Sequence, residues 1–108
     1  MEKAKRAKLS RAGWHVGSAD EFLNLSAQES ALIELKLVLS VGLRRRRIAK
    51  RLSQNDLARM LRSSQSRVAK MEASDPSVSM DLLVRAHLAL GATPRDLARA
   101  FVQASKAA

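Results

Sequence analysis

Hydrophobic residues recur at helical spacing along most of the chain, and residues that cap or break helices separate the segments. The longest segment opens at Ser26, which has the spacing of a capping box with Glu29, and runs to roughly Lys50. Ser18 and Glu21 have the same spacing and predict a short helical turn before it.

Four shorter helices are predicted after Lys50. Their caps and breaks are Ser53, the turn at Arg62 and Ser63, Ser64, the Asp75-Pro76 pair, Ser79, Gly91 and Thr93. The residues expected to face the core are Leu57, Ala58, Leu61, Val68, Met71, Leu82, Leu83, Ala86, Leu90, Leu97, Ala98 and Phe101. No segment has the pattern of a strand, so the sequence predicts an all-α protein with five helices.

The long helix has apolar residues on more than one side. Such a helix must be covered on more than one side. Three coverings are consistent with the pattern: a folded-back segment around Phe22, a twin subunit, or another protein.

Composition narrows the class of protein. The chain has 108 residues, of which 46% are hydrophobic but only 3% aromatic, and it has no cysteine. The absence of cysteine excludes disulfides, thiolate metal sites and a cysteine nucleophile. The most apolar stretch, residues 31–43, is too short to cross a bilayer. We therefore expect no membrane partner and a cytoplasmic protein.

Positive charge is concentrated in one window. The net charge is +10, and residues 44–70 contribute ten basic residues and one acidic residue. Residues 1–17 add a second basic stretch without sustained periodicity. We expect residues 1–25 to form a basic N-terminal arm with a short helical turn, and residues 26–108 to form the main domain. Such clustered positive charge favours nucleic acid as a partner.

Two short helices joined by a tight turn, spanning about Gln54 to Ala73, carry the functional prediction. If the inner residues hold the second helix down, Gln65, Ser66 and Lys70 lie on its outer surface. A helix fits the major groove with its N-terminal residues on base edges. Glutamine suits adenine and lysine suits guanine, so these three residues are predicted to contact bases.

Other residues are placed to contact phosphates. Gln54 begins the first helix of the pair, and Ser64 caps the second. The remaining candidates are the basic residues Arg67, Arg62, Arg44 and Arg47. Not all of Arg44 to Arg47 can face DNA, because successive residues lie about 100° apart around a helix.

The stretches Gln54-Asn55-Asp56-Leu57-Ala58 and Ser64-Gln65-Ser66-Arg67-Val68-Ala69-Lys70-Met71-Glu72 resemble the XRE-type helix-turn-helix family, which includes lambda-repressor-like proteins. The resemblance covers about residues 28–104. It implies a five-helix lambda-repressor-like DNA-binding domain that binds double-stranded DNA at a pseudo-palindromic operator as a homodimer, commonly as an autorepressor. By position it also assigns Gln65, Ser66 and Lys70 to bases and Gln54 to a phosphate.

One residue departs from the family pattern. The family usually has glycine in the turn where this chain has Arg62. If that position needs a positive φ, arginine is strained there by about 1 kcal/mol. Arg62 can instead add a phosphate contact.

A narrower resemblance is to antitoxins of the HigA type, which repress their own operon and neutralise a small RelE-like toxin. The small size, the single helix-turn-helix and the extra segment Gly13–Leu25 are consistent with it. The alternative function is therefore that of an antitoxin. A further alternative is nucleic-acid binding without sequence preference.

The sequence gives little support for catalysis, metal binding or a cofactor. It has no glycine-rich phosphate loop and no nucleophile elbow, and His15 and His87 stand alone. Ser64 and Ser66 beside Lys70 suggest a recognition helix more than a serine–lysine pair. We expect no enzyme activity, no metal and no cofactor.

Overall fold

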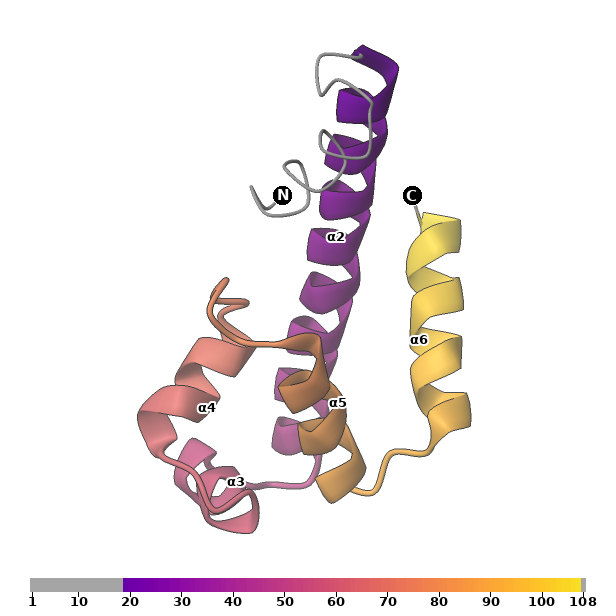
Figure 1. Ribbon diagram of the computed structural model, residues 1–108. Coiled ribbons are helices and arrows are strands. Elements are labelled where there is room, and N and C mark those ends of the chain that lie inside the picture. Colours follow the sequence, from indigo (N-terminus) through magenta and orange to yellow (C-terminus); the bar gives the residue numbers. More distant parts are fainter. Residues whose placement is uncertain (1–18, 108) are drawn as a thin grey trace. The chain divides into compact units, whose positions relative to one another are not determined.

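The computed structural model describes the backbone of residues 19–107 and the surroundings of the side chains of residues 26–105. This part of the chain contains helices and no strand. The helices are α2 (Ala19–Ala49), α3 (Gln54–Met60), α4 (Gln65–Glu72), α5 (Met80–Ala89) and α6 (Pro94–Ala107) (Figure 1). The predicted all-α, five-helix class is confirmed. The basic arm of residues 1–17 and the box expected at Ser18 lie outside the described residues.

Helix α2 is longer than expected. The separate turn predicted before Ser26 is wrong, because Ala19–Ala49 is one unbroken helix and Phe22 belongs to it. No glycine or proline lies between Ala19 and Val41 to end a helix, and a capping-box spacing also occurs inside helices. The chain divides into two compact units within α2, after Glu34. The unit that carries the remaining helices begins at Leu35.

The core of the unit 35–108 takes side chains from every helix in it. Leu39 and Leu43 of α2 are fully buried. The other buried apolar residues are Leu57, Ala58, Val68, Met71, Val78, Leu83, Ala86, Leu90, Ala92 and Leu97. Burying one such large side chain contributes about 1.5–3 kcal/mol, so this shared core is what fixes the short helices in place.

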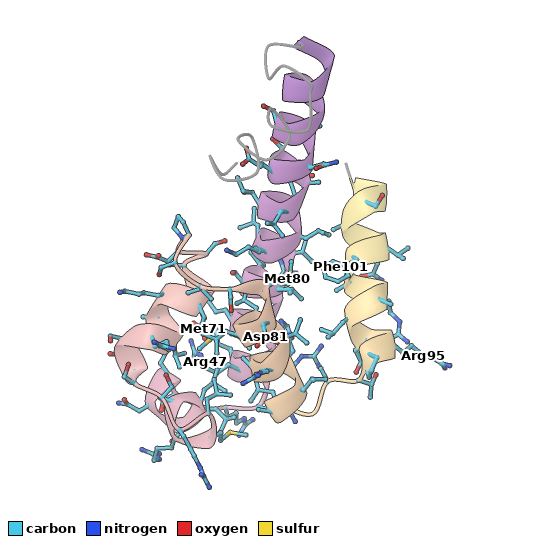
Figure 2. The ribbon with its side chains drawn as sticks, in the orientation of Figure 1. Arg47, Met71, Met80, Asp81, Arg95 and Phe101 are labelled. Carbon is cyan, nitrogen blue, oxygen red and sulfur yellow. The ribbon has the colours of Figure 1, made fainter. Side chains whose placement is uncertain are left out.

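Four expected core residues lie at the core's edge or outside it. Leu61, Leu82 and Phe101 are partly buried, and Phe101 projects from α6 toward the core (Figure 2). Ala98 is exposed, which contradicts its predicted place in the core. In the α6 helix, Leu97 and Phe101 already fill the inward stripe one turn apart, and Ala98 falls beside it.

Helices α2 to α5 all end in the same hydrogen-bonded motif. In each, one N–H reaches back five residues to a carbonyl of the last turn, as from Leu52 to Arg47 at 3.1 Å and from Ser63 to Ala58 at 2.8 Å. The corresponding bonds after α4 and α5 join Asp75 to Lys70 and Ala92 to His87, both at 3.0 Å. The motif needs a left-handed residue just before that N–H. Arg51, Arg62, Ser74 and Gly91 supply it, with φ of 59°, 53°, 58° and 93°.

Arg62 is therefore strained, as its place in the turn suggested. We expect Arg62→Gly to raise the free energy of unfolding by about 1 kcal/mol, because glycine adopts a positive φ without a steric penalty. Urea denaturation measures this change. Arg51→Gly, at the matching position after α2, is the control and is expected to give a similar gain. A loss of stability in Arg62→Gly would show that the arginine side chain contributes more than its backbone strain costs.

His87 is buried between α5 and α2. Its Nε2 donates to the Leu39 carbonyl oxygen at 2.8 Å, and its Nδ1 accepts from Arg46 Nε at 3.4 Å. Burial lowers the pKa of His87; the bond to Leu39 opposes this shift, and the charge of Arg46 adds to it. The folded protein therefore holds the neutral imidazole. Gly42 leaves room for the ring, since a Cβ there would lie 3.3 Å from His87 Cε1.

Stability should accordingly fall in mild acid. The folded-state pKa of His87 lies below the ordinary value, so its contribution is present above about pH 6.5 and is lost as the pH falls below it. As the pH falls, the free energy of unfolding is expected to fall with a slope that approaches about 1.4 kcal/mol per pH unit for this one group. Urea denaturation at pH 7.5, 6.5 and 5.5 measures it, with His87→Gln as the control without a titrating ring. An equal slope in both proteins would assign the effect to other groups.

Candidate DNA-binding surface

Helices α3 and α4 and the four-residue turn between them form the helix-turn-helix. A capping box opens α3, in which the Asp56 N–H donates to Ser53 Oγ at 3.0 Å and the Ser53 N–H donates to Asp56 Oδ2 at 2.8 Å. Ser64 caps α4 by accepting the N–H of Arg67 at 3.2 Å. The helices are held by buried side chains, Leu57 and Ala58 from α3 and Val68 and Met71 from α4. These are the inner residues that the sequence predicted.

The outer face of α4 is polar and positively charged. Gln65, Ser66, Arg67 and Lys70 are all exposed, and Ala69 between them is half-buried. The first turn of α4 holds no acidic residue, and the single carboxylate of the helix, Glu72, is turned inward. An exposed helix face with amide, hydroxyl and ammonium groups and no facing carboxylate suits a polyanion with hydrogen-bonding groups.

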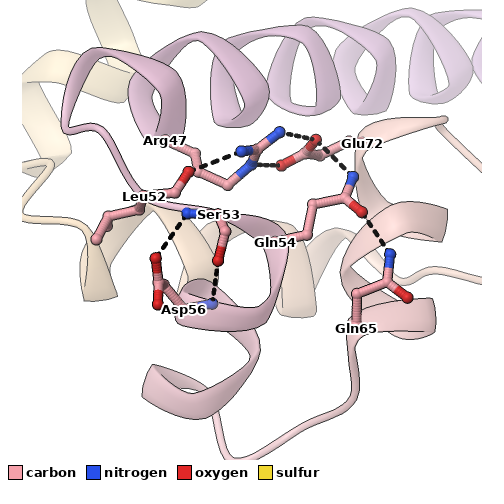
Figure 3. A network of polar contacts seen from close by, with 7 residues as sticks. All are labelled: Arg47, Leu52, Ser53, Gln54, Asp56, Gln65 and Glu72. Atoms are coloured by element: carbon pink, nitrogen blue, oxygen red, sulfur yellow. Dashed lines mark hydrogen bonds and ion pairs between the residues drawn. The ribbon is translucent and has the colours of Figure 1, made fainter.

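A chain of hydrogen bonds joins the end of α2 to the first residue of α4 (Figure 3). Arg47 donates to both oxygens of Glu72, at 2.6 and 2.9 Å, and to the Leu52 carbonyl oxygen at 2.8 Å. Gln54 Nε2 donates to Glu72 at 3.1 Å, and Gln65 Nε2 donates to Gln54 Oε1 at 2.6 Å. Gln65 is thus connected to the interior through three side chains.

Arg47 and Glu72 determine which group donates and which accepts in each of these hydrogen bonds. A guanidinium group only donates hydrogen bonds and a carboxylate only accepts them. Glu72 must therefore face the amide nitrogen of Gln54, which leaves the Gln54 oxygen to accept from Gln65. Gln65 keeps its carbonyl oxygen and one N–H for a ligand. That pair of groups, one acceptor beside one donor, matches the edge of adenine.

Glu72 is charged within this network. Burial acts to raise the pKa of Glu72, but the hydrogen bonds from Arg47 and Gln54 and the positive charges of Arg47 and Arg44 outweigh it, so the pKa is lowered. The side chains of Arg47 and Glu72 are only 12% and 4% exposed. A buried, bidentate pair of this kind holds a fixed geometry that exposed ion pairs lack.

The residues expected at phosphates divide into two groups. Ser64, Arg67, Arg62 and Arg44 are exposed, and Gln54 is half-buried with one amide N–H uncommitted. Arg47 differs from the expectation, because its guanidinium group is used by Glu72 and Leu52 and points inward (Figures 2 and 3). Its pKa is raised, chiefly by the hydrogen bond to Glu72. In this geometry Arg47 fixes the side chain of Glu72.

A polar pocket of about 390 Å³ lies beside α4. Its lining includes the predicted residues Ser64, Ser66, Arg67 and Lys70, with Ser77 and Ser79 from the start of α5 and the loop before it. The sequence predicts Ser79 only as a helix cap, and its hydroxyl does accept the N–H of Leu82 at 3.1 Å. No pattern in the sequence assigns Ser77 to the site. Its position beside α4 follows from how α5 packs, which local spacing does not encode.

Other kinds of site find no counterpart in the described residues. Among residues 26–105 no three acidic or histidine side chains are grouped as they would need to be to hold a metal ion. None of the described helices combines the length and the apolar character that crossing a membrane requires.

The fold and the exposed face of α4 define a helix-turn-helix protein of the kind that binds DNA. A family model described as helix-turn-helix matches residues 43–97, which is half of the chain and spans the end of α2 to the start of α6. The chain belongs to the XRE-type helix-turn-helix family of DNA-binding transcriptional regulators. Comparison with curated proteins and with solved structures gave no match.

Proposed function

We propose that the protein is a sequence-specific repressor that reads its operator with α4 (Gln65–Glu72). The observation that carries this proposal is the hydrogen-bonded chain from Arg47 to Gln65. It holds an otherwise exposed glutamine at the start of the recognition helix with its acceptor and one donor turned outward. A side chain that is fixed before binding loses less conformational freedom when it binds, which favours discrimination between bases.

Base contacts are assigned to Gln65, Ser66 and Lys70. Gln65 is paired with adenine, through its carbonyl oxygen to N6 and its remaining N–H to N7, and Lys70 is paired with guanine. Ser66 lies between them on the exposed face and can donate or accept. Each good contact of this kind contributes roughly 1–3 kcal/mol of discrimination.

Phosphate contacts are assigned to Gln54, Ser64, Arg67, Arg62 and Arg44. These side chains are at least partly exposed, and Arg67 and the cap residue Ser64 belong to α4 itself. Arg47 is assigned no phosphate, and its role is to fix the side chain of Glu72. The cationic residues in this set make binding depend on salt, because each neutralised phosphate releases counterions.

The protein is proposed to act as a homodimer on a pseudo-palindromic operator that includes its own promoter. One recognition helix presents few base contacts, and two that lie about 34 Å apart would occupy successive major grooves. Autorepression follows the pattern that the family resemblance implies.

Footprinting on the DNA upstream of the gene, at about 150 mM salt, tests this function. A discrete protected region with twofold symmetry is expected for the wild type, and none for a variant with Gln65→Ala and Lys70→Ala. Uniform protection of all DNA, equal in the two proteins, would instead indicate binding without sequence preference.

A second candidate function is neutralisation of a small RelE-like toxin. Leu32 and Leu35 favour it, since these two side chains of α2 are 48% and 40% exposed and can be covered by another protein. Co-expression with the neighbouring gene tests it. Stoichiometric co-purification of a small basic protein, lost in Leu32→Asp, is expected for an antitoxin, and purification of this chain alone would exclude that role.

A further inference from the structure

A row of exposed apolar side chains runs along α2. Ile33, Leu37 and Val41 follow one another at four-residue intervals and are 64%, 49% and 41% exposed. Residues four apart lie one above the other on a helix face. Large apolar side chains in a continuous row rarely face water in a monomer without a partner.

The row borders a groove between α2 and α6. This groove measures about 410 Å³ and is lined by Leu37, Val38, Val41 and Gly42 from α2 and by Ala100 and Ala104 from α6. Arg45 and Gln103 also line it. The small residues along it leave room for a helix to approach α2 closely, and the lining offers apolar contact over about two turns.

The two halves of α2 carry opposite charges. Residues 19–34 carry four acidic residues and no basic residue, whereas residues 35–49 carry five basic residues and no acidic one. A parallel pair of α2 helices would set basic half against basic half. An antiparallel pair sets the acidic half of each against the basic half of the other, which is attractive.

We propose that the α2 helices of two copies pack antiparallel about a twofold axis at Leu37. In this register Leu37 meets the partner's Leu37, and Ile33 is level with the partner's Val41. Glu29 is level with the partner's Arg45. The two members of each pair stand an equal number of residues from Leu37, on opposite sides. The apolar row of one copy therefore meets the apolar row of the other, and the acidic Glu29 meets the partner's basic Arg45.

The register also sets the spacing of the DNA-reading units. Arg47 joins α2 to α4 through Glu72, and it lies ten residues beyond Leu37. The two copies of Arg47 therefore stand about 30 Å apart along the paired helices, at a rise of about 1.5 Å per residue. This distance is close to the roughly 34 Å between successive major grooves. The inference thus deepens the proposed function and rests on it for its biological meaning, but the pairing itself can be measured without DNA.

Single cysteines test the register, because the chain has none of its own. At an interaxial distance of about 8–10 Å, Cα atoms that face each other on two helices lie close enough for a disulfide. Full-length Leu37→Cys is expected to form a covalent dimer on mild oxidation. Ile33→Cys and Val41→Cys should each stay monomeric on a denaturing gel and cross-link when mixed, since each lies about 12 Å along the axis from its own copy. Leu88→Cys, on α5 and 46% exposed, is the control and should not cross-link.

Sedimentation without DNA tests the energetics. The wild type is expected to be a dimer, and Leu37→Glu should weaken association by roughly 100-fold or more, because two carboxylates then meet at the axis. Arg45→Glu should also weaken it, and adding Glu29→Arg should restore it. Three results would overturn the proposal: a wild-type monomer, cross-linking of Ile33→Cys to a second copy of itself, or a dimer of unchanged stability in Leu37→Glu.

The same experiments separate this inference from the proposed function. If α4 reads DNA but α2 does not pair, Leu37→Glu keeps a twofold footprint at the wild-type concentration. If α2 pairs but α4 does not read DNA, Leu37→Cys cross-links while the footprint is absent. If a different protein occupies the groove in place of a second copy, the purified chain sediments as a monomer, and Leu37→Cys does not cross-link to itself.

Discussion

Replacement of Glu72 by alanine is expected to lower the free energy of unfolding by about 3–5 kcal/mol. The reason is the side chain that remains. Arg47 is 12% exposed and makes two of its hydrogen bonds to Glu72, so the substitution leaves a largely buried charge without its counterion. Gln54 also loses an acceptor. Urea denaturation near pH 7 measures the change.

Two controls make the cause of that loss visible. Asp81→Ala removes the partner of Arg85 in an ion pair whose side chains are both 72% exposed, and should cost about 0.5 kcal/mol or less. The double variant Arg47→Met, Glu72→Leu replaces both charges with apolar groups and should be close to the wild type in stability. Equal losses in Glu72→Ala and Asp81→Ala would mean that the pair between Arg47 and Glu72 is not desolvated.

The double variant also separates stability from recognition. It should fold, yet Gln54 would no longer be oriented by Glu72, and Gln65 would lose the fixed direction of its amide. We expect it to bind DNA with weaker discrimination between adenine and the other bases at the position read by Gln65, while phosphate contacts and salt dependence stay nearly unchanged.

The second large effect is expected in DNA binding. The variant with Gln65→Ala and Lys70→Ala should lose about 2–6 kcal/mol of affinity for the operator, roughly 30- to 25,000-fold, since two base contacts of about 1–3 kcal/mol each are removed. Its affinity for unrelated DNA should fall much less, in proportion to the one positive charge removed. Fluorescence anisotropy with operator and scrambled duplexes measures both.

A matched variant controls for the loss of one amide group and one positive charge elsewhere in the protein. Gln28→Ala with Arg95→Ala also removes one amide and one positive charge, but both positions lie outside α3 and α4 and are exposed, and Arg95 points away from the helices around it (Figure 2). It should bind the operator nearly as the wild type does. A similar loss in both variants would show that charge alone governs binding.

Much of the fold follows from short-range spacing in the sequence. The caps at Ser53, Ser64, Ser79 and Thr93 each begin a helix where they were expected to, because a side-chain oxygen three residues before a free N–H is a local signal. The inner residues of α3 and α4 were predicted for the same reason. The start of α2 was not, since the spacing of a capping box at Ser26 does not itself require a helix to begin there.

The tertiary part of the site could not be predicted in this way. Arg47 was grouped with its neighbours as a phosphate contact, because a run of arginines gives no sign of which one turns inward. Its partner Glu72 lies 25 residues away and meets it only once α4 has packed against α2. Gln54 and Gln65 were both expected at DNA, but their hydrogen bond to each other depends on the same packing. Local pattern thus identifies the helices and their exposed faces, and the core determines which polar groups meet.

Selection of binding sites from a random pool of duplex DNA tests the central claim most directly, that α4 reads sequence. The wild type, at about 150 mM salt, should enrich one motif with twofold symmetry and adenine at the position that Gln65 contacts. The variant with Gln65→Ala and Lys70→Ala should lose that preference, and the variant with Gln28→Ala and Arg95→Ala should keep it. A pool that stays random with the wild type, or the same motif enriched by all three proteins, would contradict the assignment of α4 as the reading helix.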